Sequence, residues 1–284
     1  MELIRGAAEL RARVDGPRSA GVGVGFVPTM GAMHGGHASL IRRARSEQDL
    51  VVVSIFVNPL QFGPEEDPSR YPRDEAKDVA LCESLGADLV WAPPNEEMYP
   101  PGVDLQTPDP GPVGETLEGA ARPGHFAGVL TVVHRLFDVV GPCTAYFGEK
   151  DAQQLFLIEE MVRTLTLPIQ IVACSTVREP DGLALSSRNV NLAPEEQAQA
   201  ACLFLALSEA AGLARAGERD AAALVAAMAR EIGATPLARL DYAAVVDVDT
   251  FEPIRTLERP ARAVVAARFP SARLIDNLRL PLPG

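Results

Sequence analysis

The first part of the chain alternates between two hydrophobic patterns. Residues 21–27, "GVGVGFV", alternate small and apolar side chains, which predicts a buried strand that ends at Pro28. From Gly36 onward, apolar residues recur at helical spacing as far as Ala44. Residues 50–57, "LVVVSIFV", form a continuous run that is typical of a parallel strand buried on both faces. Together they predict a strand–helix–strand unit.

The same alternation continues to Val177. Helices are expected over residues 74–86, 125–140 and 151–165, and strands over residues 88–93, 144–147 and 168–177. Residues 94–123 are rich in Pro and Gly and predict a long irregular connection, a kind of loop that is often functional. Strands that alternate with helices indicate an α/β fold with a doubly wound parallel sheet.

After Val177 the pattern changes. Residues 178–193 are polar, and Ala-rich helices are expected over 194–216 and 219–233. Strand-like runs follow at 242–248 and 262–269. We therefore expect a large domain over residues 1–177 and a smaller C-terminal α+β domain over residues 178–284. Because polar residues join the two, we expect the smaller domain to act as a lid.

Composition excludes several classes of protein. The 284 residues carry a formal net charge of -12, which argues against a nucleic-acid partner because phosphate contacts need a basic face. The four cysteines are scattered and form no CxxC pair, which favours reduced thiols and a cytoplasmic protein. The N-terminus lacks the apolar core of a signal peptide. No apolar run reaches the roughly 18 residues that a membrane span needs.

Candidate chemistry begins with His34 and His37, which follow the first predicted strand in "MHGGH". In a doubly wound sheet, ligands bind at the carboxyl ends of the strands, and the start of a helix favours phosphate. The spacing is neither that of a P-loop nor GxGxxG. Two alternatives stay open for the pair: solvated loop residues, or zinc ligands, although no Cys or third His stands nearby.

Other polar residues follow later strands. Lys150 and Asp151 stand where the strand at 144–147 gives way to a helix, and Arg188 follows two serines in the polar segment after Val177. Cationic and hydroxyl donors of this kind suit a triphosphate. Gln61 stands in an otherwise apolar turn, either as a solvated residue or as an amide directed at a small polar substrate.

Five motifs in order carry a resemblance to a known family. "PTMGAMHGGH", "VSIFVNPLQF", "RPGHFAGVLTVV", "YFGEKDAQQL" and "TVREPDGLALSSRN" together resemble the pantoate–β-alanine ligases. The similarity covers residues 20–192 and resumes weakly in "LDYAAVVDVDT" and "SARLIDN". The resemblance implies a Rossmann-like nucleotidyltransferase fold of the HxGH type. Gly35 and Leu185 depart from the family pattern, which usually has a polar residue and Met there.

The resemblance also implies an activity. The pantoate carboxylate would attack the α-phosphorus of ATP, with Mg²⁺ neutralising the triphosphate, to form pantoyl adenylate and pyrophosphate. The amine of β-alanine would then displace AMP and give pantothenate. A cytoplasmic homodimer with no nucleic-acid or membrane partner is expected by the same resemblance and by composition.

Site residues are implied by position in the motifs. The catalytic groups would be His37, as proton donor, with His34, Lys150 and Arg188. The ATP site would consist of Met30, Gly31, Ala32, Met33, His34, Gly35, Gly36, His37, Gly148, Glu149, Lys150, Asp151, Val177, Leu185, Ser186, Ser187 and Arg188. Gln61 and Gln154 would bind pantoate, and no residue is assigned as a protein ligand of a metal.

Two other functions remain as alternatives. A nucleotidylyltransferase acting on a phosphorylated acceptor would need additional Arg or Lys where Gln61 and Gln154 stand. A non-catalytic nucleotide sensor could do without Lys150 or His37, yet both are present.

Overall fold

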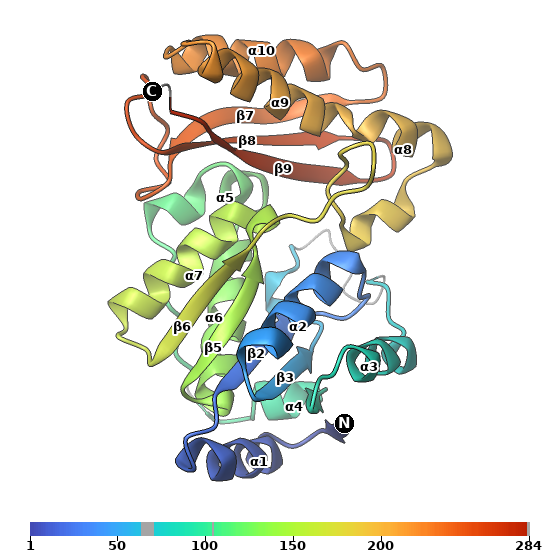
Figure 1. Ribbon diagram of the computed structural model, residues 1–284, viewed down its shortest axis with the longest axis vertical. Helices are drawn as coiled ribbons and strands as arrows, with labels where there is room; N and C mark the ends of the chain where they lie inside the picture. The colour runs from blue at the N-terminus through green and yellow to red at the C-terminus, as the bar shows by residue number, and fades with distance from the viewer. Residues whose placement is uncertain (64–70, 104, 283–284) are drawn as a thin grey trace. The chain divides into compact units, whose positions relative to one another are not determined.

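The computed structural model describes residues 1–63, 71–103 and 105–282. The chain forms two compact units (Figure 1). Unit 1 comprises Met1–Glu149 and Gln153–Ser175, and unit 2 comprises Lys150–Ala152 and Thr176–Gly284. A short stretch that includes Lys150 therefore clusters with the C-terminal residues.

Unit 1 is built on a parallel sheet (Figure 1). Its strands are β1 (Glu2–Ile4), β2 (Val24–Thr29), β3 (Leu50–Ile55), β4 (Leu89–Trp91), β5 (Cys143–Gly148) and β6 (Ile169–Cys174). They pair in the order β1-β4-β3-β2-β5-β6, and every pairing is parallel. The predicted doubly wound α/β fold is confirmed.

Helices connect these strands. They are α1 (Ala7–Ser19), α2 (Gly35–Glu47), α3 (Glu75–Ser84), α4 (Asn95–Met98), α5 (Glu118–Ala121), α6 (His125–Val140) and α7 (Ala152–Thr164). Side chains of α1, α6 and α7 share one apolar core with one face of the sheet. Side chains of α2 and α3 share a separate core with the other face. Both sheet faces are therefore buried, as the continuous apolar strands predict.

The strand order reverses direction between β2 and β5. The chain runs outward from β2 through β3 and β4, and then returns to add β5 on the other side of β2. Ligands of doubly wound sheets bind outside the carboxyl ends of the strands at this kind of reversal. A ligand is therefore expected beside the segments that leave β2 at Thr29 and β5 at Gly148.

Unit 2 has an antiparallel sheet of β7 (Arg239–Asp247), β8 (Ala261–Arg268) and β9 (Arg273–Leu280). Its helices are α8 (Pro194–Ala200), α9 (Cys202–Arg215) and α10 (Ala221–Gly233). The helices α9 and α10 lie over one face of this sheet (Figure 1), and their residues form one apolar core with it. The smaller α+β part of the predicted fold is confirmed.

Several expectations about individual elements were wrong. Pro28 does not end the first strand but lies inside β2, opposite Ser54 of β3. The residue pairs that the structure shows between β2 and β5 end at Phe26. Pro28 lies beyond the last of them, so its lack of an N–H removes no hydrogen bond from this ladder. The single helix expected over 194–216 is interrupted at Ala201, which keeps near-helical angles, so the apolar spacing gives no sign of the break.

Other elements were not predicted. Residues 94–123, expected to be irregular, contain α4, α5 and a 3₁₀ turn at Pro112–Glu115. The helix α1 and the strands β1 and β9 were also missed. β1 has three residues, too few for a periodic signal, and β9 carries two polar residues in its middle.

Candidate active site

The start of α2 is capped by its own two histidines. Nδ1 of His34 accepts a hydrogen bond from the N–H of Gly36 at 3.1 Å. Nδ1 of His37 accepts one from the N–H of His34 at 3.3 Å. This is a capping box in which imidazoles replace the usual Ser and Glu. Because an accepting Nδ1 carries no hydrogen, each neutral ring has its hydrogen on Nε2, as a donor at the positive end of a helix.

The loop before this cap is held from α3. Asp78 is buried, and its two carboxylate oxygens accept the N–H groups of Ala32 at 2.9 Å and Met33 at 2.8 Å. The backbone there is left-handed, with φ of +80° at Gly31 and +48° at Ala32. A Cβ at Gly31 would lie 2.8 Å from an Asp78 oxygen, so only glycine fits.

Gln61 ends a 3₁₀ turn, Pro59–Gln61, that follows β3. Its Oε1 accepts a bond from Nδ2 of Asn58 at 3.2 Å, and its Nε2 contacts Sδ of Met30 at 2.7 Å. Asn58 is itself buried, with Oδ1 accepting from the Tyr99 hydroxyl at 2.6 Å. The side-chain amide of Gln61 is thereby oriented next to the segment that leaves β2.

The backbone of Gln61 is held as well. Its carbonyl lies 2.8 Å from Nδ1 of His125 and accepts a bond from Arg122 at 3.3 Å. The Arg122 guanidinium, which can only donate, lies 2.9 Å from Nε2 of His125. That nitrogen must accept, so Nδ1 of His125 carries the hydrogen and donates to Gln61. The 3₁₀ turn also packs closely against α6, because a Cβ on Gly128 would lie 2.0 Å from the Leu60 carbonyl oxygen.

The segment that leaves β5 contains a 3₁₀ turn, Glu149–Asp151. The Lys150 ammonium lies 4.0 Å from the Asp151 carboxylate. Two glutamines follow in the first turn of α7. Gln153 is buried and connects the turn at residues 112–115 to α5. Its Nε2 donates to the carbonyls of Val113 and of Thr116, which follows the turn, and its Oε1 accepts the N–H of Glu118. Gln154 is only half-buried, which leaves it the more accessible of the two.

The third segment, residues 176–191, belongs to unit 2. The N–H of Leu185 donates to the Val177 carbonyl at 2.9 Å, which closes a hairpin-like turn. Gly182 in that turn has φ of +97°, and a Cβ there would lie 2.1 Å from the Phe204 ring. Oγ of Ser186 accepts the N–H of Arg188 at 3.3 Å and caps the 3₁₀ turn Ser187–Asn191. The Arg188 side chain is exposed.

The implied site residues therefore divide between the units. Those of unit 1 are Met30, Gly31, Ala32, Met33, His34, Gly35, Gly36, His37, Gln61, Gly148, Glu149 and Gln154. Those of unit 2 are Lys150, Asp151, Val177, Leu185, Ser186, Ser187 and Arg188. Within unit 1 the structure brings His34 to His37 and Met30 to Gln61, and within unit 2 it brings Val177 to Leu185 and Lys150 to Asp151.

Sequence reasoning missed Asp78 and gave no role to Gln153. Both are polar residues on helices whose spacing predicted only amphipathic packing. The available signal for Asp78 was weak, since an acidic residue near a helix start is usually solvated.

Asp78 also acts on Cys82 one turn later: burial, together with the charge of Asp78, raises the pKa of the Cys82 thiol to about 12. That thiol is therefore a packed neutral group and no nucleophile.

The described residues contain neither a candidate metal site nor a membrane-spanning helix. No group of three or more His, Cys, Asp and Glu in residues 1–63, 71–103 and 105–282 is arranged to hold a metal ion. No helix within those residues is long and apolar enough to cross a membrane.

Comparison with known proteins identifies the family. A family model described as pantoate-beta-alanine ligase matches residues 2–279. The chain is 53% identical over 278 residues to a pantothenate synthetase of Roseiflexus sp. (strain RS-1), with 98% of both chains covered. It is 52% identical over 280 residues to that of Thermus thermophilus, with 99% of both chains covered.

Solved structures agree. A crystal structure of the pantothenate synthetase from Thermus thermophilus has a TM-score of 0.93 and 50% identity, and covers 99% of this chain and 100% of its own. Pantoate-beta-alanine ligase from Francisella tularensis, crystallised with β-γ ATP and β-alanine, has a TM-score of 0.79 and 33% identity, covering 98% and 97%. The resemblance seen in the five sequence motifs is confirmed, and the chain belongs to the pantoate–β-alanine ligase family.

Proposed function

We propose that this enzyme condenses pantoate with β-alanine at the expense of ATP, through a pantoyl-adenylate intermediate. In the first step a carboxylate oxygen of pantoate forms a bond to the α-phosphorus, and the bond from that phosphorus to the bridging oxygen breaks. Pyrophosphate leaves. In the second step the amine of β-alanine bonds to the acyl carbon, loses a proton and expels AMP, which leaves pantothenate.

The observation that carries this proposal is the reciprocal histidine cap of α2. It lies at the reversal of strand order, where nucleotides bind in doubly wound sheets. The cap uses Nδ1 of His34 and of His37 as acceptors, which puts the ring hydrogens on Nε2, and we assign these Nε2–H groups as donors to the nucleotide. Preorganised hydrogen-bond donors stabilise the negative charge that develops on the phosphoryl oxygens in the transition state. Adenylyl transfer depends mainly on this kind of stabilisation.

The other residues receive roles by charge and position. Lys150 and Arg188 bind the triphosphate, with the hydroxyls of Ser186 and Ser187. The remaining members of the ATP set, from Met30 to Gly36 and from Gly148 to Asp151 with Val177 and Leu185, line the nucleotide. Support comes from the closed turn that joins Val177 to Leu185 and from the capped turn that holds Arg188.

Gln61 binds pantoate, with Gln154 as its partner. An amide orients the substrate without the strong paired bonds that an Arg would form to the nucleophilic carboxylate. Such bonds would have to weaken as the oxygen attacks phosphorus, so they would stabilise the ground state more than the transition state. The anchoring of Gln61 by Asn58, on the side chain, and by His125, on the backbone, supports a precise orientation.

Mg²⁺ enters as part of the MgATP substrate. Magnesium takes most of its ligands from phosphate oxygens and water and needs few carboxylates from the protein.

Isotope exchange between pyrophosphate and ATP tests the function. We expect exchange that requires pantoate and does not require β-alanine. Exchange that depends instead on a phosphorylated acceptor would indicate a nucleotidylyltransferase. ATP binding with no exchange under any of these conditions would indicate a nucleotide sensor.

Three further properties are proposed, of which the homodimer rests on the family resemblance alone. The C-terminal unit acts as a lid, so that hydrogen exchange in residues 178–192 slows when ATP is added; unchanged exchange at saturating ATP would contradict this.

The enzyme is a homodimer, which sedimentation analysis would test. It works in the cytoplasm, in keeping with four cysteines that are all unpaired thiols in the described part of the chain.

A further inference from the structure

Two adjacent residues of β9, Asp276 and Asn277, point to opposite faces of the sheet in unit 2. Successive side chains of a strand alternate between faces. Leu274 and Leu280 contribute to the apolar core shared with α9 and α10, so Asp276 lies on that same face. Asn277 lies on the other face, as does Arg262 of β8, whose neighbours Ala261 and Ala263 belong to the core.

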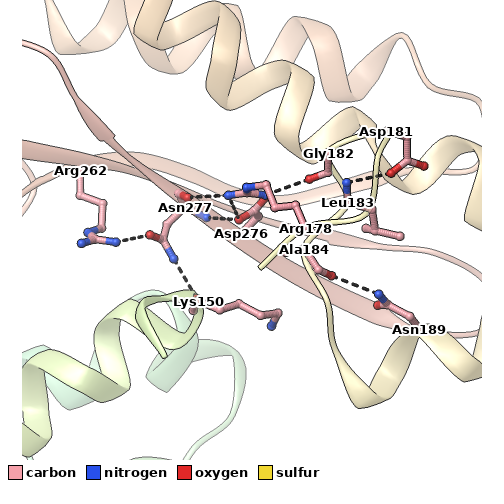
Figure 2. A network of polar contacts seen from close by, with 10 residues as sticks. All are labelled: Lys150, Arg178, Asp181, Gly182, Leu183, Ala184, Asn189, Arg262, Asp276 and Asn277. Carbon is pink, nitrogen blue, oxygen red and sulfur yellow. Dashed lines mark hydrogen bonds and ion pairs between the residues drawn. The ribbon is translucent and has the colours of Figure 1, made fainter. Parts of the chain in front are cut away.

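Asn277 holds the main chain of Lys150 (Figure 2). Its Nδ2 donates to the Lys150 carbonyl at 2.8 Å, and its Oδ1 accepts a bond from Arg262. A guanidinium can only donate, so it fixes which end of the Asn277 amide is the oxygen. The NH₂ end is then directed at Lys150. The amide therefore has one orientation, and it holds the main chain of Lys150 to β9.

Asp276 holds the segment after Val177 (Figure 2). Its carboxylate accepts two bonds from Arg178, at 2.6 and 2.9 Å, in the fork geometry that Arg forms with carboxylates. The Asp276 side chain is only 2% exposed. Arg178 also donates to the Gly182 carbonyl at 3.0 Å, and its guanidinium lies 4.4 Å from the Phe204 ring centre. The turn that precedes Ser186 and Arg188 is thus fixed from the opposite face of the same strand.

We propose that Asp276 and Asn277 are positioning residues for catalysis. Asn277, oriented by Arg262, places Lys150, and Asp276, acting through Arg178, places the segment that carries Arg188. Neither residue touches substrate. The inference rests on the proposed roles of Lys150 and Arg188 in binding the triphosphate. It adds that one rigid strand of unit 2 sets the position of both cations.

A double-mutant cycle tests the Asn277 half. Asn277→Asp keeps an oxygen for Arg262 but replaces the donor to Lys150 with an acceptor. We expect it to lower single-turnover adenylation about 10- to 100-fold, the scale of a small misplacement of a binding group. In a Lys150→Ala background the same change should cost less than about twofold, because residues that act as a unit are not additive. Gln197→Glu, the same change of charge on exposed α8, is the control and should be neutral.

The same cycle with Arg178→Lys and Arg188→Ala tests the Asp276 half. Lys keeps the charge but not the paired bonds to Asp276. A loss in adenylation that is equally large with and without Arg188 would overturn this half. Equal losses of adenylation for Asn277→Asp with and without Lys150 would overturn the Asn277 half. A variant that only damages the structure would lose the same activity whether or not Lys150 is present.

Chemical labelling separates this inference from the proposed function. The chain has only two lysines, Lys77 and Lys150, so an amine-reactive ester followed by mass spectrometry reports each one. We expect Asn277→Asp to change the labelling rate of Lys150 and to leave that of Lys77 as in the wild type. This result would support the positioning role even if the pantoate-dependent exchange failed. Unchanged labelling of Lys150 would overturn it even if the exchange succeeded.

Discussion

His34 and His37 hold one another at the start of α2, with ring centres 4.2 Å apart and the N–H of His34 bonded to Nδ1 of His37. The same two side chains therefore cap the start of a helix, and we propose that they also donate hydrogen bonds to the nucleotide. A simple alanine substitution would remove both properties at once. The cap itself suggests a cleaner experiment.

The first prediction concerns the double variant His34→Ser, His37→Glu. It restores the common Ser and Glu capping box, so the helix start and the midpoint of thermal unfolding should stay close to the wild type. The imidazole donors are lost, and single-turnover adenylation should fall about 10²- to 10³-fold, as should His37→Ala. Adenylation within about threefold of the wild type in either variant would refute the catalytic role of the pair.

The second prediction concerns the proposed pantoate site. Gln61→Ala and Gln154→Ala should each weaken the dependence of pyrophosphate release on pantoate by roughly 1–3 kcal/mol, because a polar substrate group loses its partner. ATP affinity measured by calorimetry should stay nearly unchanged. Gln170→Ala, an exposed glutamine on β6, is the matched control. An equal fall in ATP affinity would show that these amides do not form the pantoate site.

The third prediction concerns Asp78. Asp78→Asn leaves one side-chain acceptor for the two N–H groups of Ala32 and Met33. The loop, which is in left-handed conformation, therefore loses a charge-assisted hydrogen bond that contributes about 1.5–3 kcal/mol to its stability. We expect a higher KM for ATP together with a lower midpoint of unfolding. Asp74→Asn, at the exposed cap of the same helix, should lower stability slightly and leave that KM unchanged. A normal KM in Asp78→Asn would mean that the loop does not need this anchor.

The fourth prediction concerns the contact between α6 and the turn that carries Gln61. Gly128→Ala would place a Cβ 2.0 Å from the Leu60 carbonyl oxygen, so the turn must move and pantoate use should fall. Gly212→Ala, in α9 with open space around it, should instead stabilise the protein by about 0.5–1 kcal/mol. Chemical denaturation and pantoate titration measure both effects. Wild-type pantoate use in Gly128→Ala would exclude the close contact.

The fifth prediction concerns alkaline pH. Burial raises the pKa of Cys82, with a contribution from Asp78, and that of Cys143, each from 9.0 to about 12. The native state keeps these protons while the unfolded chain loses them, so stability is complete below about pH 9 and falls as pH rises toward 12. Urea midpoints measured across this range should decrease. The decrease should be smaller in a Cys82→Ala, Cys143→Ala variant, and an identical decrease would show that other groups cause it.

The sequence by itself determined the architecture and the family. Continuous apolar strands and helices of period 3.6 can bury their side chains only in a layered α/β fold, and the structure has that fold. The five motifs identified the family because each combines turn residues with imidazole, charged or amide groups in a fixed order. The histidine pair could also be placed correctly at a helix start, since Gly36 and the following apolar positions mark where the helix begins.

Only the tertiary structure revealed the residues that hold these groups in place. Asp78 is 46 residues from Ala32 in the chain, and Asn277 is 127 residues from Lys150. No local pattern links such positions, because their pairing depends on which strands and helices become neighbours. The strand β9 shows the reason most clearly. Its central residues Asp276 and Asn277 interrupt the apolar pattern by which a strand is predicted. They are tolerated at these buried positions because Arg178 and Arg262 donate hydrogen bonds to them.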